Sequence, residues 1–264
     1  MKNQNSHIIK TTNLAIGYFN RKETTCVVDN INLSLNKGNF VCILGKNGIG
    51  KSTLLRTLTK VQPKLSGEII LNGKTLESIS NPELAKKMSL VLTERIPESN
   101  LTVYELIALG RQPYTNWIGK LNNKDHQQIN LAIKQVHIEG LLDKRHDELS
   151  DGQLQKVMIA RALAQDTELI ILDEPTAHLD IHNKIEIFTL LKKLCRELHK
   201  TVLISTHEIH LALQLANELW LMNDDGIISG ATEKLIADGS VSKLFSSDII
   251  TFDKKSKQFI INNH

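Results

Sequence analysis

Hydrophobic residues gather in short runs separated by polar segments, and this pattern predicts alternating strands and helices. The apolar runs at residues 40–44, 168–172 and 201–205 are typical of buried parallel strands. Other segments repeat apolar positions every three to four residues. In residues 125–137, Ile129, Ala132, Ile133 and Val136 fall on one helix face. The chain therefore predicts an α/β fold.

The first 35 residues favour an antiparallel β patch, with strand-like runs at 7–10, 24–28 and 31–35. Residues 17–20 are expected to form a turn that carries Tyr18 and Phe19. A Tyr18 ring there could stack on an adenine base or pack into the core, and its position alone leaves both open. Residues 64–73 predict a strand followed by an Asn72-Gly73 hairpin turn, and residues 88–92 predict a further short strand.

Residues 101–164 read as a helical subdomain inserted into the α/β core. Helices are expected at 103–109 and 125–137, with a loop at 110–119 that carries Tyr114 and Trp117. Ser150 is a suitable N-cap for a helix through Leu163. Beyond it we expect helices at 181–199 and 209–216 and a strand at 218–222. The tail is polar and mixed, and a helix and a strand would suffice to close the domain.

Composition narrows the function classes. The chain has 264 residues, a net charge of +3 and 41% hydrophobic residues, and its Lys and Arg residues form no basic block that would indicate nucleic-acid binding. No window approaches the roughly 20 apolar residues of a membrane span, and we expect no signal peptide. Cys26, Cys42 and Cys195 have no metal-binding spacing and are expected to be reduced core residues.

Residues 45–53 carry the clearest chemistry. Gly45, four residues, Gly50, Lys51 and Ser52 have the spacing of a phosphate-binding loop between a strand and a helix. Glycines allow a tight turn that directs backbone N–H groups toward an anion, and the helix adds its positive end. Lys51 can reach the β- and γ-phosphates, and the Ser52 hydroxyl can bind Mg²⁺. The alternative is a glycine-rich turn without a ligand.

Two further segments place polar residues after predicted strands. Asp173 and Glu174 follow the run at 168–172, and His207 follows the run at 201–205. Ligands of such sheets bind at the carboxyl ends of the strands. Taken alone, the two carboxylates could also cap a helix, and the histidine could be an ordinary core or surface residue.

The order of these motifs, with Leu-Ser-Asp-Gly-Gln at 149–153 between them, resembles the ATP-binding cassette (ABC) ATPases over about residues 7–240. The resemblance implies a P-loop NTPase core at about 7–100 and 165–240, a helical signature subdomain at about 101–164, and a tail at about 241–264, all within one ABC ATPase domain spanning 1–264. It also implies ATP and Mg²⁺ as cofactors.

The resemblance implies roles residue by residue. Lys51, Glu174 and His207 match the catalytic groups, with Glu174 as general base and His207 as a switch residue near the γ-phosphate. Ser52, Glu94 and Asp173 match the residues that bind Mg²⁺ in the family. The remaining nucleotide contacts match Tyr18, Gly45, Asn47, Gly48, Gly50, Thr53, Ser150, Gly152, Gln153 and Asp180. Ser150, Gly152 and Gln153 correspond to the segment that contacts the γ-phosphate from the opposite subunit, and Asp180 to the loop that crosses the dimer interface.

Two positions depart from the family pattern. Glu94 stands where the family usually has glutamine, and Asp151 stands where it usually has glycine. Each adds a negative charge close to the expected phosphates. We expect hydrolysis to continue but to be slower or more dependent on the metal.

The stretch 108–114, with its Gly-Arg-x-Pro-aromatic sequence, resembles the ATPases of importers for siderophore-bound iron, haem and vitamin B12. That resemblance implies a head-to-tail, ATP-dependent homodimer at the cytoplasmic face of the cell membrane. Its expected partners are integral membrane permease subunits and, indirectly, a substrate-binding protein, with no nucleic acid. The alternatives are an exporter or lipid-transport ATPase, or an ABC ATPase acting on nucleic acid or ribosomes.

Overall fold

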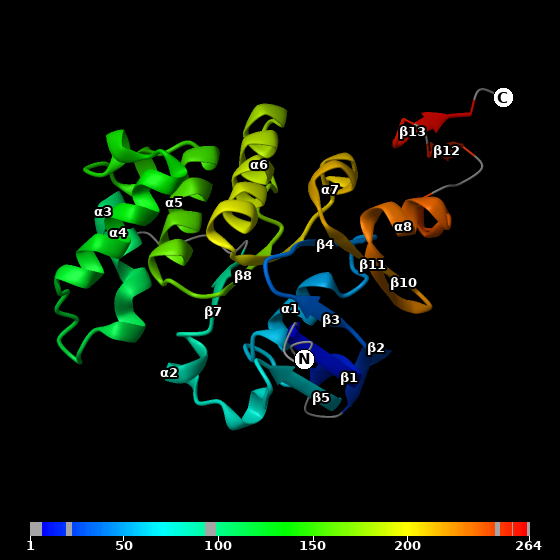
Figure 1. Ribbon diagram of the computed structural model, residues 1–264, viewed down its shortest axis with the longest axis horizontal. Coiled ribbons are helices and arrows are strands. Elements are labelled where there is room, and N and C mark those ends of the chain that lie inside the picture. Colours follow the sequence, from blue (N-terminus) through cyan, green and yellow to red (C-terminus); the bar gives the residue numbers. More distant parts are fainter. Residues whose placement is uncertain (1–6, 20–22, 93–98, 246–248, 255, 263–264) are drawn as a thin grey trace, which may run out of the picture. The chain divides into compact units, whose positions relative to one another are not determined.

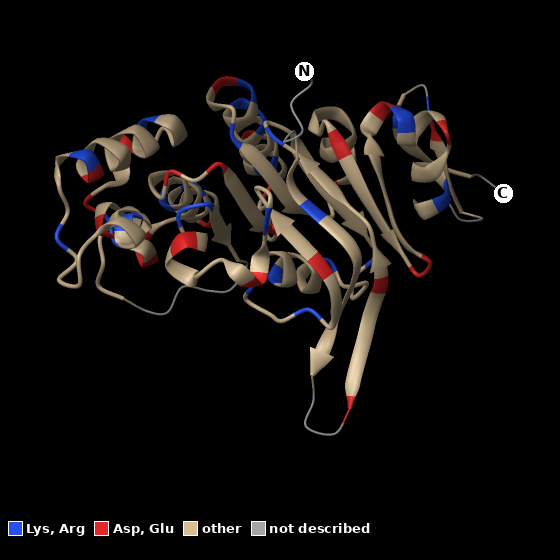
Figure 2. Ribbon diagram, turned by 60° about the horizontal axis from the view of Figure 1, so that its bottom comes forward, with Lys and Arg blue, Asp and Glu red and all other residues tan. Residues whose placement is uncertain are grey.

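The computed structural model describes residues 7–19, 23–92, 99–245, 249–254 and 256–262. It consists of two compact units (Figure 1), one formed by Met1–Ser78 with Thr201–His264 and the other by Ile79–Lys200. We call them the first and second unit. Basic and acidic residues are interspersed along the helices and strands of both (Figure 2).

The first unit contains a mainly parallel sheet around one central strand. Its strands are β4 (Phe40–Gly45), β9 (Thr201–Ser205), β10 (Glu218–Asn223) and β11 (Gly226–Ala231). β4 pairs in parallel with β9 on one side and β10 on the other, and β11 pairs antiparallel with β10. The first five residues of β4 are all fully buried, as the apolar run predicts. The strand is therefore a rigid base for the glycine-rich loop that follows it.

The first unit also contains an antiparallel sheet. It contains β1 (His7–Phe19), β2 (Thr24–Ile31), β3 (Ser34–Asn36), β5 (Ser66–Leu71) and β6 (Lys74–Thr75). The Asn72-Gly73 hairpin turn between β5 and β6 is confirmed. The turn expected at residues 17–20 is wrong for residues 17–19, because β1 continues through Phe19 and Tyr18 pairs with Thr25 of β2; Asn20 lies outside the described residues. Gly17 makes this possible, since a Cβ there would collide with the Thr25 carbonyl.

Helices and a hairpin complete the first unit. They are η1 (Leu76–Ser78), α1 (Lys51–Leu58), α7 (Ile209–Leu215), α8 (Thr232–Ala237), α9 (Ser240–Phe245), β12 (Ile250–Asp253) and β13 (Gln258–Ile261). The sequence pattern did not indicate β11 or α8. In the tail, the Phe259 ring of β13 packs against Phe252 at 4.9 Å and Phe245 at 5.8 Å between ring centroids. A small aromatic cluster therefore holds the tail elements together.

The second unit combines two parallel strands with a group of helices. Its elements are α2 (Asn81–Leu84), β7 (Met88–Val91), α3 (Val103–Ala108), η2 (Leu109–Tyr114), α4 (Asn123–Val136), η3 (Glu139–Leu141), η4 (His146–Glu148), α5 (Asp151–Ala164), β8 (Leu169–Asp173) and α6 (Ile181–Leu198). β7 and β8 pair in parallel. α5 packs against both α3 and α4. Residues 110–114 form the 3₁₀ helix η2, not the expected loop.

A buried ion pair explains why η2 is helical. Arg111 and Asp125 are 2% and 1% exposed, and Nε of Arg111 lies 2.9 Å from Oδ1 of Asp125. Arg111 also donates to the Ala164 carbonyl of α5 at 2.8 Å, and its guanidinium lies 3.9 Å from the centroid of the Tyr114 ring. Asp125 in turn accepts the N–H of Asn122, the N-cap residue of α4, and completes a capping box. Tyr114 thus packs inside the helical group, while Trp117 is 94% exposed.

The cysteine expectation is confirmed in part. All three cysteines are free, and Cys42 and Cys195 are buried, but Cys26 is exposed because β2 lies at the edge of its sheet. In the described part of the chain, every helix is too short or too polar to cross a membrane.

Candidate functional site

The glycine-rich segment forms a loop between β4 and α1 in the first unit. Gly50 ends the loop with φ 111°, a conformation that favours glycine, and a Cβ there would lie 2.6 Å from the Val27 side chain. A Cβ at Gly45 would lie 2.6 Å from the Met222 carbonyl oxygen. Both glycines therefore let the loop pass close to neighbouring strands and turn into the helix. The N-terminal amides of α1 begin at this point, where an anion is stabilised.

Lys51 is 5% exposed and its ammonium group lies against the loop. Nζ donates to the carbonyl oxygens of Gly45 at 3.0 Å and Lys46 at 3.2 Å. It also lies 3.3 Å from Nε2 of His207. His207 follows β9, the parallel neighbour of β4, so the carboxyl ends of the two strands bring both side chains to one edge. The family resemblance implies a place near the γ-phosphate for His207, and the loop motif implies one for Lys51.

Tyr18 is tied to the same loop by its hydroxyl group. The Tyr18 and Thr53 hydroxyl oxygens are 2.5 Å apart, which joins the end of β1 to the first turn of α1. About half of the Tyr18 side chain is exposed, so the ring has a free surface on which a planar base can stack. Ser52 is half-buried beside Thr53, and Asn47 and Gly48 are exposed on the loop.

The acidic residues lie at the end of β8 in the second unit. Asp173 closes the strand and is 3% exposed, and Glu174 is half-buried. Glu174 has φ 45°, the left-handed region that non-glycine residues rarely adopt. Its carbonyl accepts the Ala177 N–H at 3.1 Å. The Asp173 and Glu174 carboxylates therefore both lie at the end of β8, and a tight turn fixes the backbone of Glu174.

The Leu-Ser-Asp-Gly-Gln motif forms the start of α5. The Ser150 Oγ accepts the Gln153 N–H at 3.3 Å, while Oε1 of Gln153 accepts the Ser150 N–H at 3.1 Å. This reciprocal capping box confirms Ser150 as the N-cap. Asp151 is exposed in the first turn, and Gly152 is buried. The motif thus presents a helix N-terminus whose positive end suits a phosphate.

Asp180 is the N-cap of α6, and its carboxylate is held by Asn183. The backbone N–H of Asn183 donates to Oδ1 at 2.9 Å, and its side-chain Nδ2 donates to Oδ2 at 2.7 Å. These two bonds, the backbone one foremost, lower the pKa of Asp180 below its usual value. Sequence reasoning missed Asn183. Its position three residues after an aspartate N-cap was the available signal.

The predicted residues divide between the two units. The first unit brings together Tyr18, Thr53, Lys51, His207 and the loop glycines, while the second carries Ser150, Gly152, Gln153, Asp173, Glu174 and Asp180. Glu94 lies outside the described residues. Ser52 and Asp173 supply a hydroxyl and a carboxylate oxygen, the donor types that Mg²⁺ prefers. Taken separately, the first unit can bind an anion and stack a base, and the second can orient a cation or polarise water.

Comparisons with known proteins agree on one family. A family model described as ABC transporter matches residues 28–177. An uncharacterised ABC transporter ATP-binding protein of Methanocaldococcus jannaschii is 40% identical, over 97% of this chain and 88% of that protein. The iron(3+)-hydroxamate import ATP-binding protein of Bacillus subtilis is 33% identical, over 94% of this chain and 92% of its own length. A dimeric ATP-binding cassette in a post-hydrolysis state with ADP and phosphate matches with a TM-score of 0.73 and 29% identity, over 85% of this chain and 98% of that chain.

Proposed function

Because this chain belongs to the ABC transporter ATPases, we propose that it is the ATP-hydrolysing subunit that powers a membrane importer. The proposed cargo is an iron-siderophore, haem or cobalamin-type compound. The observation that best supports ATP hydrolysis is the position of Lys51. Its side chain is buried, and its ammonium group donates hydrogen bonds to two loop carbonyls and lies beside His207. Phosphate oxygens entering the loop would replace these carbonyls as its partners.

The proposed catalytic roles are those that the family resemblance implies for these side chains. Tyr18 stacks on adenine, while the loop amides, Lys51 and Thr53 hold the phosphates. Ser52 and Asp173 hold Mg²⁺, which supplies charge neutralisation on the phosphates. Glu174 orients and deprotonates the attacking water, and His207 contacts the γ-phosphate.

Two copies complete each site in this proposal. The loop, Asp173 and Glu174 of one copy face Ser150, Gly152 and Gln153 of the other, with Asp180 at the contact between them. A triphosphate then joins the copies and its hydrolysis releases them, which makes ATP the ligand of a two-state element. The dimeric relative that holds ADP and phosphate supports this arrangement.

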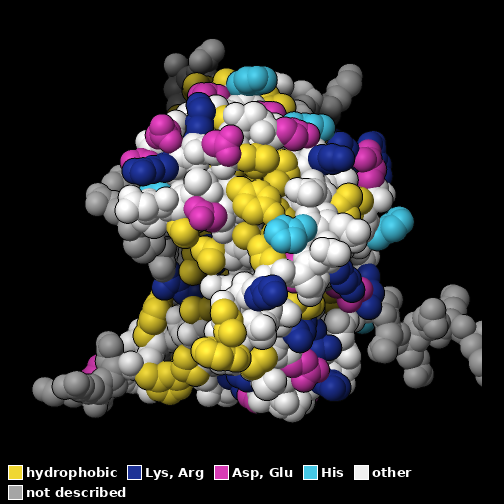
Figure 3. Space-filling model, turned by 90° about the vertical axis from the view of Figure 1, so that its left-hand side faces the viewer, with side chains coloured by type: hydrophobic (Ala, Val, Ile, Leu, Met, Phe, Trp, Pro, Cys, Tyr) yellow, Lys and Arg dark blue, Asp and Glu magenta, His cyan; other side chains and the backbone are white. Residues whose placement is uncertain are grey.

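A permease docks on the helical group of the second unit. A cavity of about 210 Å³ lies there, and its lining combines Leu101, Ala108, Leu109 and Leu121 with Glu105, Gln112, Thr115 and Gly119. Beside it the Asn116 side chain accepts the N–H groups of Ile118 and Lys120 and shapes a turn. This turn exposes 94% of Trp117 and 68% of Ile118, and hydrophobic side chains are visible among charged ones on the α3–α5 side of the molecule (Figure 3). Exposed apolar groups beside a partly apolar cavity suit a permease helix.

Recovery of the chain with membranes tests the docking. In cells that carry the complete transporter, Trp117→Ala is expected to lower the membrane-bound fraction several-fold, since Trp is a frequent anchor residue of interfaces. ATP hydrolysis by the purified variant should stay at the wild-type level. Leu131→Ala, at another exposed apolar position on α4, is the control. Unchanged membrane recovery of the Trp117 variant would remove the proposed docking surface.

Uptake of radioactive iron as a hydroxamate chelate tests the cargo class. A strain lacking the chain is expected to lose this uptake and to regain it with the wild-type chain but not with Lys51→Ala. Full uptake in the deletion strain would exclude that cargo.

A further inference from the structure

The first turns of α5 and α6 contact each other through Gly152 and Asn183. A Cβ added at Gly152 would lie 2.5 Å from Oδ1 and 3.1 Å from Nδ2 of Asn183, so the Asn183 amide lies directly against the Gly152 backbone. The same amide donates to Asp180 at 2.7 Å. Asn183 therefore touches both the start of α5 and the N-cap of α6.

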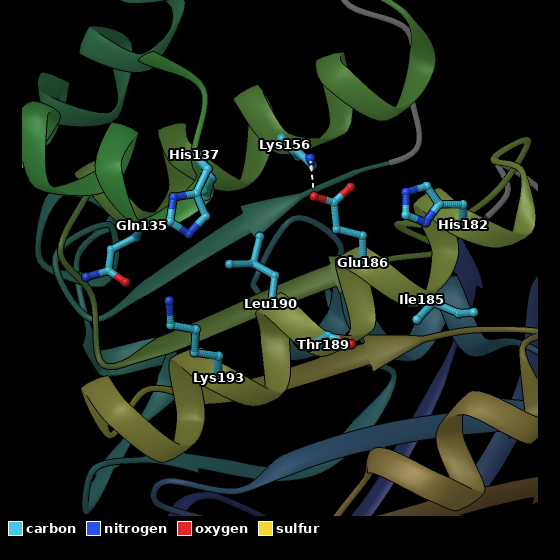
Figure 4. Close-up of a pocket in the computed structure, with 10 residues that line it drawn as sticks. Gln135, His137, Lys156, His182, Ile185, Glu186, Thr189, Leu190 and Lys193 are labelled. Atoms are coloured by element: carbon cyan, nitrogen blue, oxygen red, sulfur yellow. Dashed lines mark hydrogen bonds and ion pairs between the residues drawn. The ribbon is translucent and has the colours of Figure 1, made fainter. Parts of the chain in front are cut away.

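An ion pair makes a second contact between the same helices. Lys156 lies one turn after Gly152, and Glu186 lies one turn after Asn183, so each pair shares a helix face. Nζ of Lys156 is 2.5 Å from Oε1 of Glu186, the dashed line in Figure 4. We call these four residues the α5–α6 seam.

A cavity of about 310 Å³ adjoins the seam. Lys156 and Glu186 line it, together with Thr189, Leu190 and Lys193 of α6 and the end of α4, and Leu190 and Lys193 face it in Figure 4. We expect the alignment of the two first turns to depend on these contacts of the seam.

We propose that Asn183 is a positioning residue for the ATP site, a role that rests on the proposed function. Both segments that it touches, the Ser150 turn and Asp180, face the second copy in the composite site. Asn183 fixes the distance between the start of α5 and Asp180, so that both segments contact the second copy at the same time. Its side chain contacts neither nucleotide nor metal. A displacement of about 1 Å at such a site can lower the rate on the order of a hundredfold.

The contact predicts how two substitutions combine. In Gly152→Ala the new Cβ forces the Asn183 amide to turn away, which breaks its bond to Asp180. Asn183→Ala removes that bond and also leaves room for the Cβ. The two substitutions therefore cause the same loss, and their effects should not add.

ATPase kinetics of four proteins test this coupling: wild type, Gly152→Ala, Asn183→Ala and the double variant. Gly152→Ala is expected to lower kcat on the order of tenfold in the native background and less than about threefold in the Asn183→Ala background. KM for ATP should change less than about twofold, because Tyr18, Lys51 and the rest of the loop, which make most of the proposed ATP contacts, are intact. Thr189→Ala, on the same helix, should match the wild type. An equal loss of kcat in both backgrounds would overturn the proposal.

Thermal unfolding of the same four proteins tests the contact without catalysis. Gly152→Ala is expected to lower Tm in the native background and to lower it much less when Asn183 is already alanine. Additive losses of Tm would show that Asn183 and Gly152 are not coupled. A wild-type chain without ATPase activity would contradict the proposed function, and the unfolding data would still decide whether the contact exists.

Discussion

Glu174→Gln is expected to lower kcat for ATP hydrolysis on the order of a hundredfold or more. The amide keeps the shape of the side chain but cannot accept the proton of the attacking water. Because Glu174 belongs to the turn after β8 and its carbonyl accepts the Ala177 N–H, the substitution leaves the backbone intact. Phosphate release from saturating Mg-ATP measures the effect.

ATP binding separates this result from misfolding. The Glu174→Gln variant should bind ATP as the wild type does and should accumulate as an ATP-bound dimer in size-exclusion chromatography, because the link between copies is no longer hydrolysed. Glu139→Gln, at an exposed position of the same unit, should behave as wild type. Hydrolysis by Glu174→Gln at more than about a tenth of the wild-type rate would assign the general base elsewhere.

Asp125→Ala is expected to destabilise the protein by about 3–5 kcal/mol. It leaves the guanidinium of Arg111, 2% exposed, without its carboxylate and also removes the acceptor of the Asn122 backbone N–H at the start of α4. In a chain of this size the loss corresponds to a fall in Tm on the order of 10 °C. Thermal unfolding followed by circular dichroism measures it.

An exposed ion pair provides the matched control. Arg196 and Glu197 are paired at 2.7 Å but are 74% and 43% exposed. Glu197→Ala should therefore cost less than about 1 kcal/mol. A similar Tm for both variants would mean that burial of the Arg111–Asp125 pair has no special importance.

The pair also sets a dependence on pH. Burial raises the pKa of Asp125, but the Asn122 backbone bond and Arg111 together outweigh it and hold the pKa below its usual value. The native state therefore favours the charged carboxylate. Its contribution to stability is present above the pKa of the unfolded chain and is lost as the pH falls through the folded pKa.

Local sequence patterns were sufficient to predict the elements whose formation depends on neighbouring residues in the chain. The apolar run before Gly45 predicted a buried strand, since continuous aliphatic residues suit a strand covered on both faces. Ser150 predicted the start of α5, because a serine side chain can accept a backbone N–H of the first helical turn. The Asn72-Gly73 turn was predicted from glycine chemistry in the same way.

Features that depend on distant residues were not predictable from local patterns. Tyr18 extends β1 because β2 pairs with it, and a Gly-Tyr-Phe sequence alone suggests a turn. Residues 110–114 become helical because Arg111 finds Asp125 and the Ala164 carbonyl, which lie 14 and 53 positions away. Asn183 gains its importance from Gly152, a residue of another helix. Exposure of Cys26 follows from its place on an edge strand.

The central claim is that one catalytic site is built from two copies of the chain, and mixing two inactive variants tests it most directly. Lys51→Ala removes the phosphate-binding ammonium group, and Ser150→Arg blocks the segment that faces the other copy. Each variant alone should be inactive. An equal mixture is expected to hydrolyse ATP at about a quarter of the wild-type rate, because half of the randomly formed dimers carry one intact site of two. A mixture with no more activity than its separate components would contradict the account.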